Sequence, residues 1–180
     1  MQVNQVCYST HDIEATARSL AETDQIGPFY IGAFPLNGTI YRGRTVEYGS
    51  IRVGFGYRAG LQYELIEAPK GQPSCYAEVL EGRREALHHI YHGTDEDYDA
   101  IVARYAAAGE ELAYHGLAGE GVRFGFIDAM SRLGHFVEVL ETDKIVGEGR
   151  RIYDIYERIE AASRGWDGGR PIRPLGEAMT

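Results

Sequence analysis

The chain of 180 residues lacks several features that mark particular classes of protein. No segment approaches the roughly 18 consecutive apolar residues that a membrane helix needs. The N-terminus has no basic start and no long apolar run, so we expect no signal peptide and take a cytoplasmic location as the default. Two cysteines, Cys7 and Cys75, are too few for a disulfide scaffold, and we expect two buried thiols.

Basic charge and nucleotide-binding or hydrolase motifs are also scarce. The net charge of −9 argues against binding to a phosphate backbone, which requires clustered Lys and Arg. The glycine-rich stretch Gly116–Gly121 lacks the Lys of a P-loop, and no G-x-S-x-G elbow is present. We therefore expect neither a nucleic acid nor a membrane as partner. The 44% hydrophobic and 25% charged residues are ordinary for a globular domain with a full core.

The body of the chain repeats one order of elements: a strand, a helix and three further strands. Apolar and β-branched runs predict the strands, and apolar residues at three- and four-residue spacing predict the helices. The first half has predicted strands at Val3–Ser9, Phe29–Phe34, Thr45–Tyr57 and Leu61–Glu67, and a helix from Thr10 or His11 to about Thr23. The second half has predicted strands at Leu87–His92, Glu111–Tyr114, Val122–Asp128 and His135–Leu140, and a helix at Asp95–Ala108. A short helix, Ser74–Leu80, capped by Ser74, is predicted between them.

The last part of the chain, Thr142–Thr180, does not repeat this order. Arg150–Ser163 is predicted to be a helix with one apolar face, formed by Ile152, Ile155, Tyr156 and Ile159. Pro171 and Pro174 keep the following segment extended. Two arrangements stay open: the helix packs on its own domain, or it reaches across a homodimer.

Four predicted strands each carry one potential metal ligand within an otherwise apolar stretch. Because alternate strand residues point to opposite faces, Glu64 shares a face with Gln62 and Ile66. By the same rule Glu138 shares a face with Phe136 and Leu140, and His89 lies on the face opposite His88. The first strand carries Gln5.

Taken singly, a mid-strand Glu is more often salt-bridged or half exposed than bound to a metal. The repeat changes this balance, because equivalent strands of both halves carry a potential ligand: Gln5 and His89 in the first strand, Glu64 and Glu138 in the last. A shared cation would remove the cost of burying two carboxylates.

These motifs resemble the vicinal oxygen chelate superfamily over roughly residues 3–141. Leu87-His88-His89-Ile90 resembles a segment of methylmalonyl-CoA epimerases in which the second His binds metal. The segments 62–67 and 136–141 resemble the two Glu-bearing strands of that family. The resemblance implies an α+β domain over 1–141, in which two βαβββ modules, about 1–68 and 86–141, form a curved mixed sheet around a cup. Residues 142–180 would be a C-terminal helix and extended tail.

The resemblance also implies a function. Gln5, Glu64, His89 and Glu138 would hold a divalent ion, and the donor set suits Zn, Co, Ni, Mn or Fe. The substrate would chelate through two oxygens, and Glu138 or Glu64 would act as the catalytic base that removes a proton beside a carbonyl. We therefore expect a metal-dependent isomerase, epimerase or lyase.

The residue at the first metal-ligand position differs between subfamilies of this superfamily. Epimerases of this superfamily usually have His where this chain has Gln5, and the set Gln, Glu, His, Glu occurs in some lactoylglutathione lyases. Those lyases carry an Arg four residues later, where this chain has Ser9, which argues against glutathione as co-substrate. Two alternatives stay open: a non-catalytic binding protein of the bleomycin-resistance type, and an Fe(II) ring-cleaving dioxygenase.

Aromatic residues on the predicted strands suggest the kind of substrate. On most proteins such residues belong to the core. If some line the cup, they favour a small-molecule carbonyl or aromatic substrate, and the candidate substrate-binding residues are Phe29, Tyr57, Tyr91, Phe124 and Phe126. Association into a homodimer is expected as well.

Overall fold

The computed structural model describes residues 4–92, 96–118, 121–141 and 150–180. Its strands are β1 (Asn4–Thr10), β2 (Phe29–Pro35), β3 (Asn37–Tyr41), β4 (Arg44–Val46), β5 (Ser50–Arg58), β6 (Leu61–Glu67), β7 (Glu85–His92), β8 (Leu112–Ala118), β9 (Val122–Ile127), β10 (Phe136–Leu140) and β11 (Ile172–Pro174). Its helices are α1 (Ile13–Asp24), α2 (Cys75–Glu78), α3 (Tyr98–Ala107), α4 (Met130–Leu133), α5 (Arg150–Ser163) and the 3-10 helix η2 (Leu175–Ala178). Val3 and Asp95, at which two predicted elements begin, lie outside the described residues.

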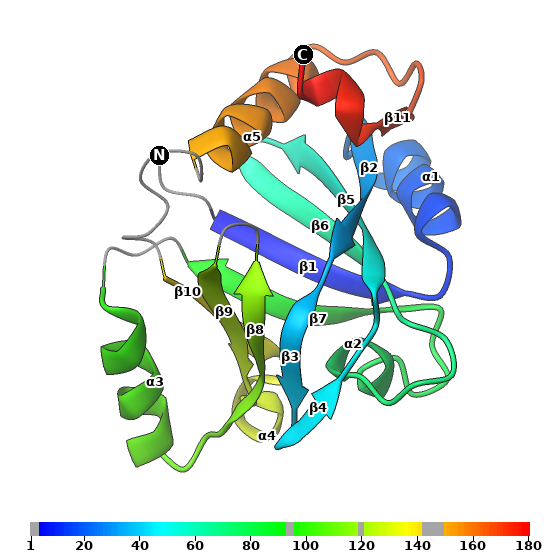
Figure 1. Ribbon diagram of the computed structural model, residues 1–180. Helices are drawn as coiled ribbons and strands as arrows, with labels where there is room; N and C mark the ends of the chain where they lie inside the picture. The colour runs from blue at the N-terminus through cyan, green and yellow to red at the C-terminus, as the bar shows by residue number, and fades with distance from the viewer. Residues whose placement is uncertain (1–3, 93–95, 119–120, 142–149) are drawn as a thin grey trace.

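One mixed sheet runs through the molecule in the order β11-β2-β5-β6-β1-β7-β10-β9-β8-β3-β4. Its centre consists of two halves with the same order, β2-β5-β6-β1 and β8-β9-β10-β7, which meet at the antiparallel pair β1–β7 (Figure 1). In each half the first strand is parallel to a neighbour, β6 or β10. The expected α+β fold, with two βαβββ modules in a curved mixed sheet, is confirmed.

Each half has a helix on the outer face of the sheet. Asp12 caps α1 by accepting a hydrogen bond from the backbone N–H of Ala15, and Asp97 caps α3 in the same way. Ile13 and Ala17 of α1 pack against Phe29 and Leu65, while Tyr98 and Ile101 of α3 pack against the second half. These contacts use the outward-facing residues of the strands, which leaves the opposite face for the interior.

The predicted strand Thr45–Tyr57 is wrong as a single element. Gly49 has a φ of +70°, a backbone conformation that glycine adopts without strain, and it lies between β4 and β5. β3 was not predicted at all. It follows β2 after a single residue and pairs with β8, so the chain leaves the first half of the sheet and extends the second half (Figure 1).

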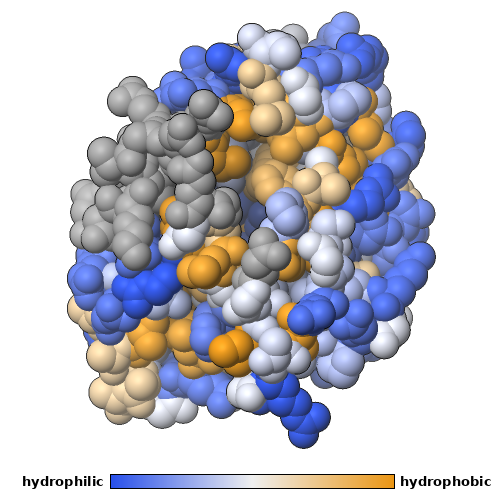
Figure 2. Space-filling view, viewed as in Figure 1, coloured by the Kyte–Doolittle hydropathy of each residue, from blue (hydrophilic) through white to orange (hydrophobic). Residues whose placement is uncertain are grey.

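The tail packs on the first half of its own chain, which is the first of the two open arrangements. The helix α5 has the predicted bounds, and Ile155 and Ile159 join the core that contains Phe55 and Tyr57 of β5. β11 then runs parallel to β2, and Leu175 lies against Gly32. α5, β11 and η2 thus gather over β2 and β5, and Figure 2 shows apolar side chains between α5 and these strands.

Two further expectations can be compared with the described residues. Cys7 and Cys75 are both buried and unpaired, as expected. Ser74 caps α2 by accepting a hydrogen bond from the backbone N–H of Ala77, also as expected. Among the described helices, none combines the length and the hydropathy of a membrane-spanning segment.

Candidate metal centre

The four candidate ligands lie on the four central strands of the sheet, in the order β6-β1-β7-β10. Cross-strand neighbours point to the same face, so the register shows which side chains gather. Cys7 of β1 is the neighbour of Glu64 on β6 and also of His89 on β7. His89 in turn is the neighbour of Phe136 on β10, two residues before Glu138. The inward faces of all four strands therefore meet around Cys7 and His89.

Three of the four candidates are brought together. The Nε2 atom of His89 lies 3.3 Å from a carboxylate oxygen of Glu64 and 3.4 Å from one of Glu138. The His89 side chain has no exposed surface, and both carboxylates are only 12% exposed. Despite these short distances Nε2 makes no well-formed hydrogen bond. The His89 nitrogen is thus buried between two acids without a hydrogen-bond acceptor in line with it.

The charges in this group perturb one another. Burial alone would lower the pKa of His89, but the Glu138 and Glu64 carboxylates raise it from 6.5 to about 9. Burial raises the pKa of Glu138, and the His89 ring opposes that change. The same burial, helped by the charge of Glu64, raises the pKa of the Cys7 thiol well above its usual range, so Cys7 is a neutral thiol.

Gln5 is buried on the same face but has another partner. Its side-chain N–H donates to the amide oxygen of Gln62 at 2.8 Å, and the Gln62 amide donates to the hydroxyl of Tyr57 at 2.6 Å. Among the described residues, no hydrogen bond joins Gln5 to Glu64, His89 or Glu138. The amide oxygen of Gln5 remains the atom that could bind a cation.

The candidate substrate-binding residues fall into two groups. Tyr57, Tyr91, Phe124 and Phe126 are buried, and the register places them on the inward face. Phe126 stacks on the His89 ring, with centroids 4.7 Å apart and planes at 24°. Phe29 lies elsewhere: it is fully buried with Ile13 and Leu65 under α1, on the outer face of the sheet. Phe29 therefore cannot line the cup.

Sequence analysis missed the position of one inward residue, His88, and the hydrogen bond of another, Gln62. His88 was expected on the face opposite His89, yet both side chains have no exposed surface and their Nδ1 atoms lie 2.8 Å apart. Burial and the neighbouring His89 hold the pKa of His88 well below its usual range, so His88 is neutral. Gln62 was placed on the correct face, but its bond to Gln5 could not be read from the sequence.

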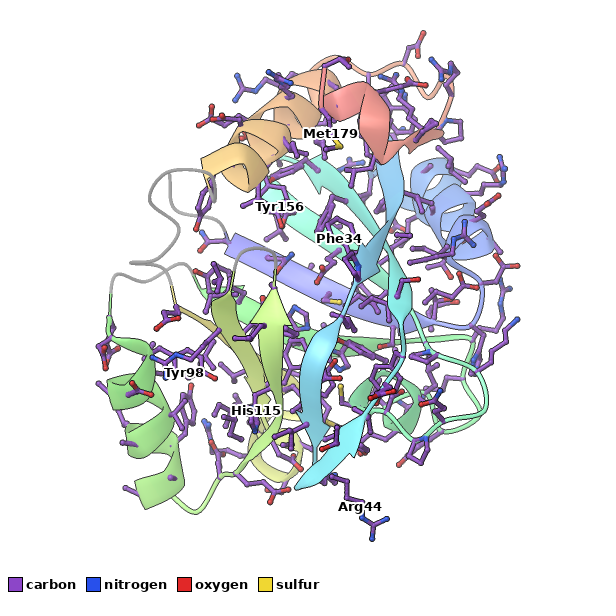
Figure 3. The ribbon with its side chains drawn as sticks, viewed as in Figure 1. Phe34, Arg44, Tyr98, His115, Tyr156 and Met179 are labelled. Atoms are coloured by element: carbon purple, nitrogen blue, oxygen red, sulfur yellow. The ribbon has the colours of Figure 1, made fainter. Side chains whose placement is uncertain are left out.

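Tyr156 of α5 also belongs to this region. Its ring packs on Phe55, with centroids 5.0 Å apart, and Phe55 is the cross-strand neighbour of Glu64. Burial, with the charges of Glu64 and Glu138, raises the pKa of Tyr156 well above its usual range. Figure 3 shows Tyr156 on the side of α5 that faces the strands. The apolar face predicted for this helix indicated that it would pack, but not against which strand.

The paired βαβββ halves, with acidic residues on the inward faces of their central strands, define a vicinal oxygen chelate fold. A solved structure of methylmalonyl-CoA epimerase in complex with methylmalonyl-CoA and NH4+ is 21% identical, with a TM-score of 0.50, and covers 77% of this chain and 92% of its own. A variant of the Streptomyces coelicolor methylmalonyl-CoA epimerase in complex with 2-nitronate-propionyl-CoA is 22% identical, with a TM-score of 0.50, and covers 78% of this chain and 96% of its own.

A hypothetical protein from Bacillus halodurans C-125 is 16% identical, with a TM-score of 0.51, and covers 77% of this chain and 91% of its own. No protein-family model and no curated protein matches the chain. At these identities the likeness establishes the vicinal oxygen chelate fold and leaves the reaction to be argued from the site.

Proposed function

We propose that this protein is a divalent-metal-dependent isomerase, epimerase or lyase that removes a proton beside a carbonyl group. The observation that carries the proposal is the position of His89 Nε2, which is buried between two carboxylates at 3.3 and 3.4 Å without a well-formed hydrogen bond. Without a metal, His89 must hold a proton to balance the two buried carboxylates, and a bound divalent cation would balance them in its place.

The donor atoms fit such an ion. Gln5, Glu64, His89 and Glu138 would hold it through an amide oxygen, two carboxylates and an imidazole, a set that suits Zn, Co, Ni, Mn or Fe. When bound, the ion would supply a Lewis acid that stabilises negative charge on a substrate oxygen. The amide of Gln5 would keep its N–H bond to Gln62 and use its oxygen, so Gln62 fixes which end of the amide faces the site.

The chain's own residues would move the proton. Glu138 is buried, and burial raises its pKa, which makes it a better proton acceptor than an exposed carboxylate. Glu64 lies on the other side of His89, on β6. One carboxylate could therefore take a proton from one face of the substrate while the other returns a proton to the opposite face. An epimerase needs two such groups, and either Glu alone would suffice for an isomerase or lyase.

The walls of the site favour an apolar or aromatic carbonyl substrate. Tyr57, Tyr91, Phe124 and Phe126 surround the ligands on the inward face, and Tyr156 adds a further ring from α5. These rings would exclude water from a carbanion or enolate, which prolongs its lifetime against protonation by solvent. We include Tyr156 among the residues proposed to contact the substrate.

Elemental analysis of protein purified without chelator tests the metal first. We expect about one divalent ion per chain, and loss of that ion in the Glu138→Gln variant. Glu67→Gln is the matched control, because Glu67 lies on β6 and pairs with Arg52 outside the site. A chain that holds no metal and gains no stability from added metal would contradict the proposal and favour a non-catalytic binding protein.

Proton exchange tests the chemistry. The metal-loaded protein would be incubated in heavy water with a panel of 2-oxo acids, aromatic ketones and acyl thioesters, including methylmalonyl-CoA, and exchange at the carbon beside the carbonyl followed by NMR. Exchange that depends on Glu138 but not on Glu67 supports the proposal. Oxygen uptake with catechols by the iron-loaded protein, with no exchange in the panel, would instead indicate a ring-cleaving dioxygenase.

A further inference from the structure

The pairing of β1 with β7 is irregular at the candidate centre. Cys7 pairs with His89, but the next residue, Tyr8, pairs with Leu87, so His88 is an extra residue opposite this step. In such a bulge two residues oppose one, and the side chains lose their strict alternation between faces. This is why both rings point inward, with centroids 5.1 Å apart and planes at 78°.

The two imidazoles meet through one hydrogen bond. Their Nδ1 atoms are 2.8 Å apart, so one nitrogen carries the proton and the other accepts it. The direction is set by the other end of the His89 ring. If Nε2 of His89 binds a cation between Glu64 and Glu138, it must offer a lone pair, and the His89 proton must be on Nδ1. The hydrogen bond must then run from the Nδ1–H group of His89 to the Nδ1 atom of His88.

We propose that His88 is a positioning residue for the metal centre: it accepts the Nδ1 proton of His89 and so holds the tautomer and ring orientation in which His89 Nε2 faces the two carboxylates. This inference rests on the proposed function, since it takes His89 as a metal ligand. A ligating His commonly donates its second ring N–H to a carboxylate, backbone carbonyl or water. Here a neutral imidazole fills that place.

The surroundings of His88 suit this role. Its ring packs against Tyr76 at 4.9 Å, Phe126 at 4.8 Å and Phe136 at 5.1 Å, measured between centroids. Such an apolar shell disfavours a charged imidazole and prevents the ring from turning. The same Phe126 ring stacks on His89. One aromatic residue thus holds both members of the pair.

This tautomer of His88 leaves one buried N–H group without a partner in the described part of the chain. With Nδ1 as acceptor, the proton of His88 is on Nε2, and Nε2 is buried without a hydrogen-bond partner among the described residues. An unsatisfied buried N–H destabilises a protein. A structural role alone would favour Phe or Leu at this position, which would avoid that cost.

A competing assignment uses the same residues differently. Cys7, His88 and His89 each offer a ligand atom, and these atoms lie within 4.8 Å of one another. Two imidazole nitrogens on one tetrahedral zinc, each about 2.0–2.1 Å from it, would be about 3.3 Å apart. The observed 2.8 Å between the two Nδ1 atoms is a hydrogen-bond distance instead, so these two atoms are not joint ligands of one ion.

Cobalt and zinc binding to purified wild type, His88→Phe and His88→Asn tests the inference. Phe keeps an aromatic ring without an acceptor, whereas the side-chain amide of Asn can place an oxygen near the position of Nδ1. We expect Co²⁺ affinity to fall by about 10–100-fold in His88→Phe and to recover for the most part in His88→Asn. His115→Phe on β8 is the matched control and should bind like wild type.

A spectroscopic readout separates positioning from simple packing. In the zinc-loaded wild type, nitrogen-15 NMR of the histidine rings should show His89 protonated at Nδ1 and metal-bound at Nε2. This measurement needs no variant, so it decides the matter even if His88→Phe fails to fold. A His89 ring protonated at Nε2 would overturn the inference.

The outcomes distinguish this inference from the proposed function. If wild type binds neither metal, the metal-dependent function fails and the role of His88 fails with it. If wild type binds Co²⁺ and His88→Phe binds equally well, only the role of His88 is wrong. If Co²⁺ shows a thiolate charge-transfer band that Cys7→Ser removes, the metal lies at the Cys7–His88–His89 cluster and the inference is overturned.

Discussion

The two halves of the sheet use equivalent positions for different purposes. Phe55 on β5 is the cross-strand neighbour of Glu64, and Phe126 on β9 is the cross-strand neighbour of Glu138. Phe55 packs against Tyr156 of the tail, whereas Phe126 packs against the rings of His88 and His89. The first half is therefore covered by a helix from outside the repeat, and the second half is filled by its own aromatic residues.

The residues two positions before Glu64 and Glu138 also differ between the two halves. Gln62 of the first half is polar and connects Gln5 to Tyr57, while Phe136 of the second half is apolar and packs on His88. Hydrogen-bonded amides can exchange partners with a ligand, but interlocked rings cannot move without opening a cavity. The comparison indicates that packed rings hold the proposed ligand His89 in the second half, whereas hydrogen bonds that can rearrange hold the proposed ligand Gln5 in the first half.

The largest expected effect is on catalysis. Replacing the proposed base and ligand by Glu138→Gln should lower proton exchange by at least about 10²–10⁴-fold, because the amide can neither accept the proton nor hold the ion as the carboxylate would. Glu64→Gln, in the first half, would show whether both carboxylates take part in proton transfer. Exchange rates measured by NMR in heavy water compare them, and equal, small losses in both variants would break the assignment of a base.

The next largest effect is the loss of folding stability when either of two equivalent aromatic residues is replaced. Phe126→Ala and Phe55→Ala should each destabilise the fold by about 3–5 kcal/mol, since each removes a buried ring. Only Phe126→Ala should also weaken Co²⁺ binding, because only Phe126 stacks on His89. Urea denaturation and metal titration measure the two effects separately. A similar loss of metal affinity in Phe55→Ala would contradict the difference between the halves.

A smaller effect is expected from the amide chain of the first half. Gln62→Leu should destabilise the protein by about 1–3 kcal/mol, because Gln5 and Tyr57 each lose a buried partner. Tyr57→Phe should cost less, since Gln62 keeps its bond to Gln5. Denaturation curves of the two variants would sharpen the comparison. An unchanged midpoint for Gln62→Leu would show that the hydrogen bonds from Gln5 through Gln62 to Tyr57 do not stabilise the fold.

The most gradual effect follows from pH. In the metal-free protein the folded-state pKa of His89 is raised from 6.5 to about 9, so the folded state binds this proton more tightly than the unfolded chain. The stabilisation is fully present below pH 6.5 and is lost as the pH rises through about 9. Between these values the free energy of unfolding should fall by about 1 kcal/mol per pH unit relative to His89→Gln.

Chelator-treated protein denatured by urea at several pH values measures this change. A difference between wild type and His89→Gln that stays constant from pH 6.5 to 9 would mean that the carboxylates do not act on His89 as described.

Elements set by local chemistry could be predicted from the sequence. The helix Arg150–Ser163 follows from its apolar spacing, and Ser74 caps α2 because its hydroxyl lies three residues before a free backbone N–H. The strand Leu61–Glu67 also has the predicted bounds, with Glu64 on the inward face. Each of these features depends on residues that are close together in the chain.

Features set by distant pairing could not be predicted. β3 begins with Asn37 and Gly38, which are typical of turns, and only its pairing with β8 extends the strand through them. The bulge at His88 depends on the register of β7 against β1, so alternation along β7 alone placed His88 on the wrong face. Phe29 was assigned to the cup because the sequence shows which residues are apolar but not which face α1 covers. The grouping of Glu64, His89 and Glu138 was suggested by the repeat and by the family resemblance, not by local chemistry.

The ends of the sheet have a consequence for self-association. β11 and β4, the outermost strands, have three residues each, and they cover the longer strands β2 and β3. Such short edges offer few free backbone groups to another chain. The homodimer expected from the sequence would therefore form through side-chain surfaces rather than by continuing the sheet from one subunit into the next. Light scattering of wild type and of a variant with a proline in β4 would show equal masses if so.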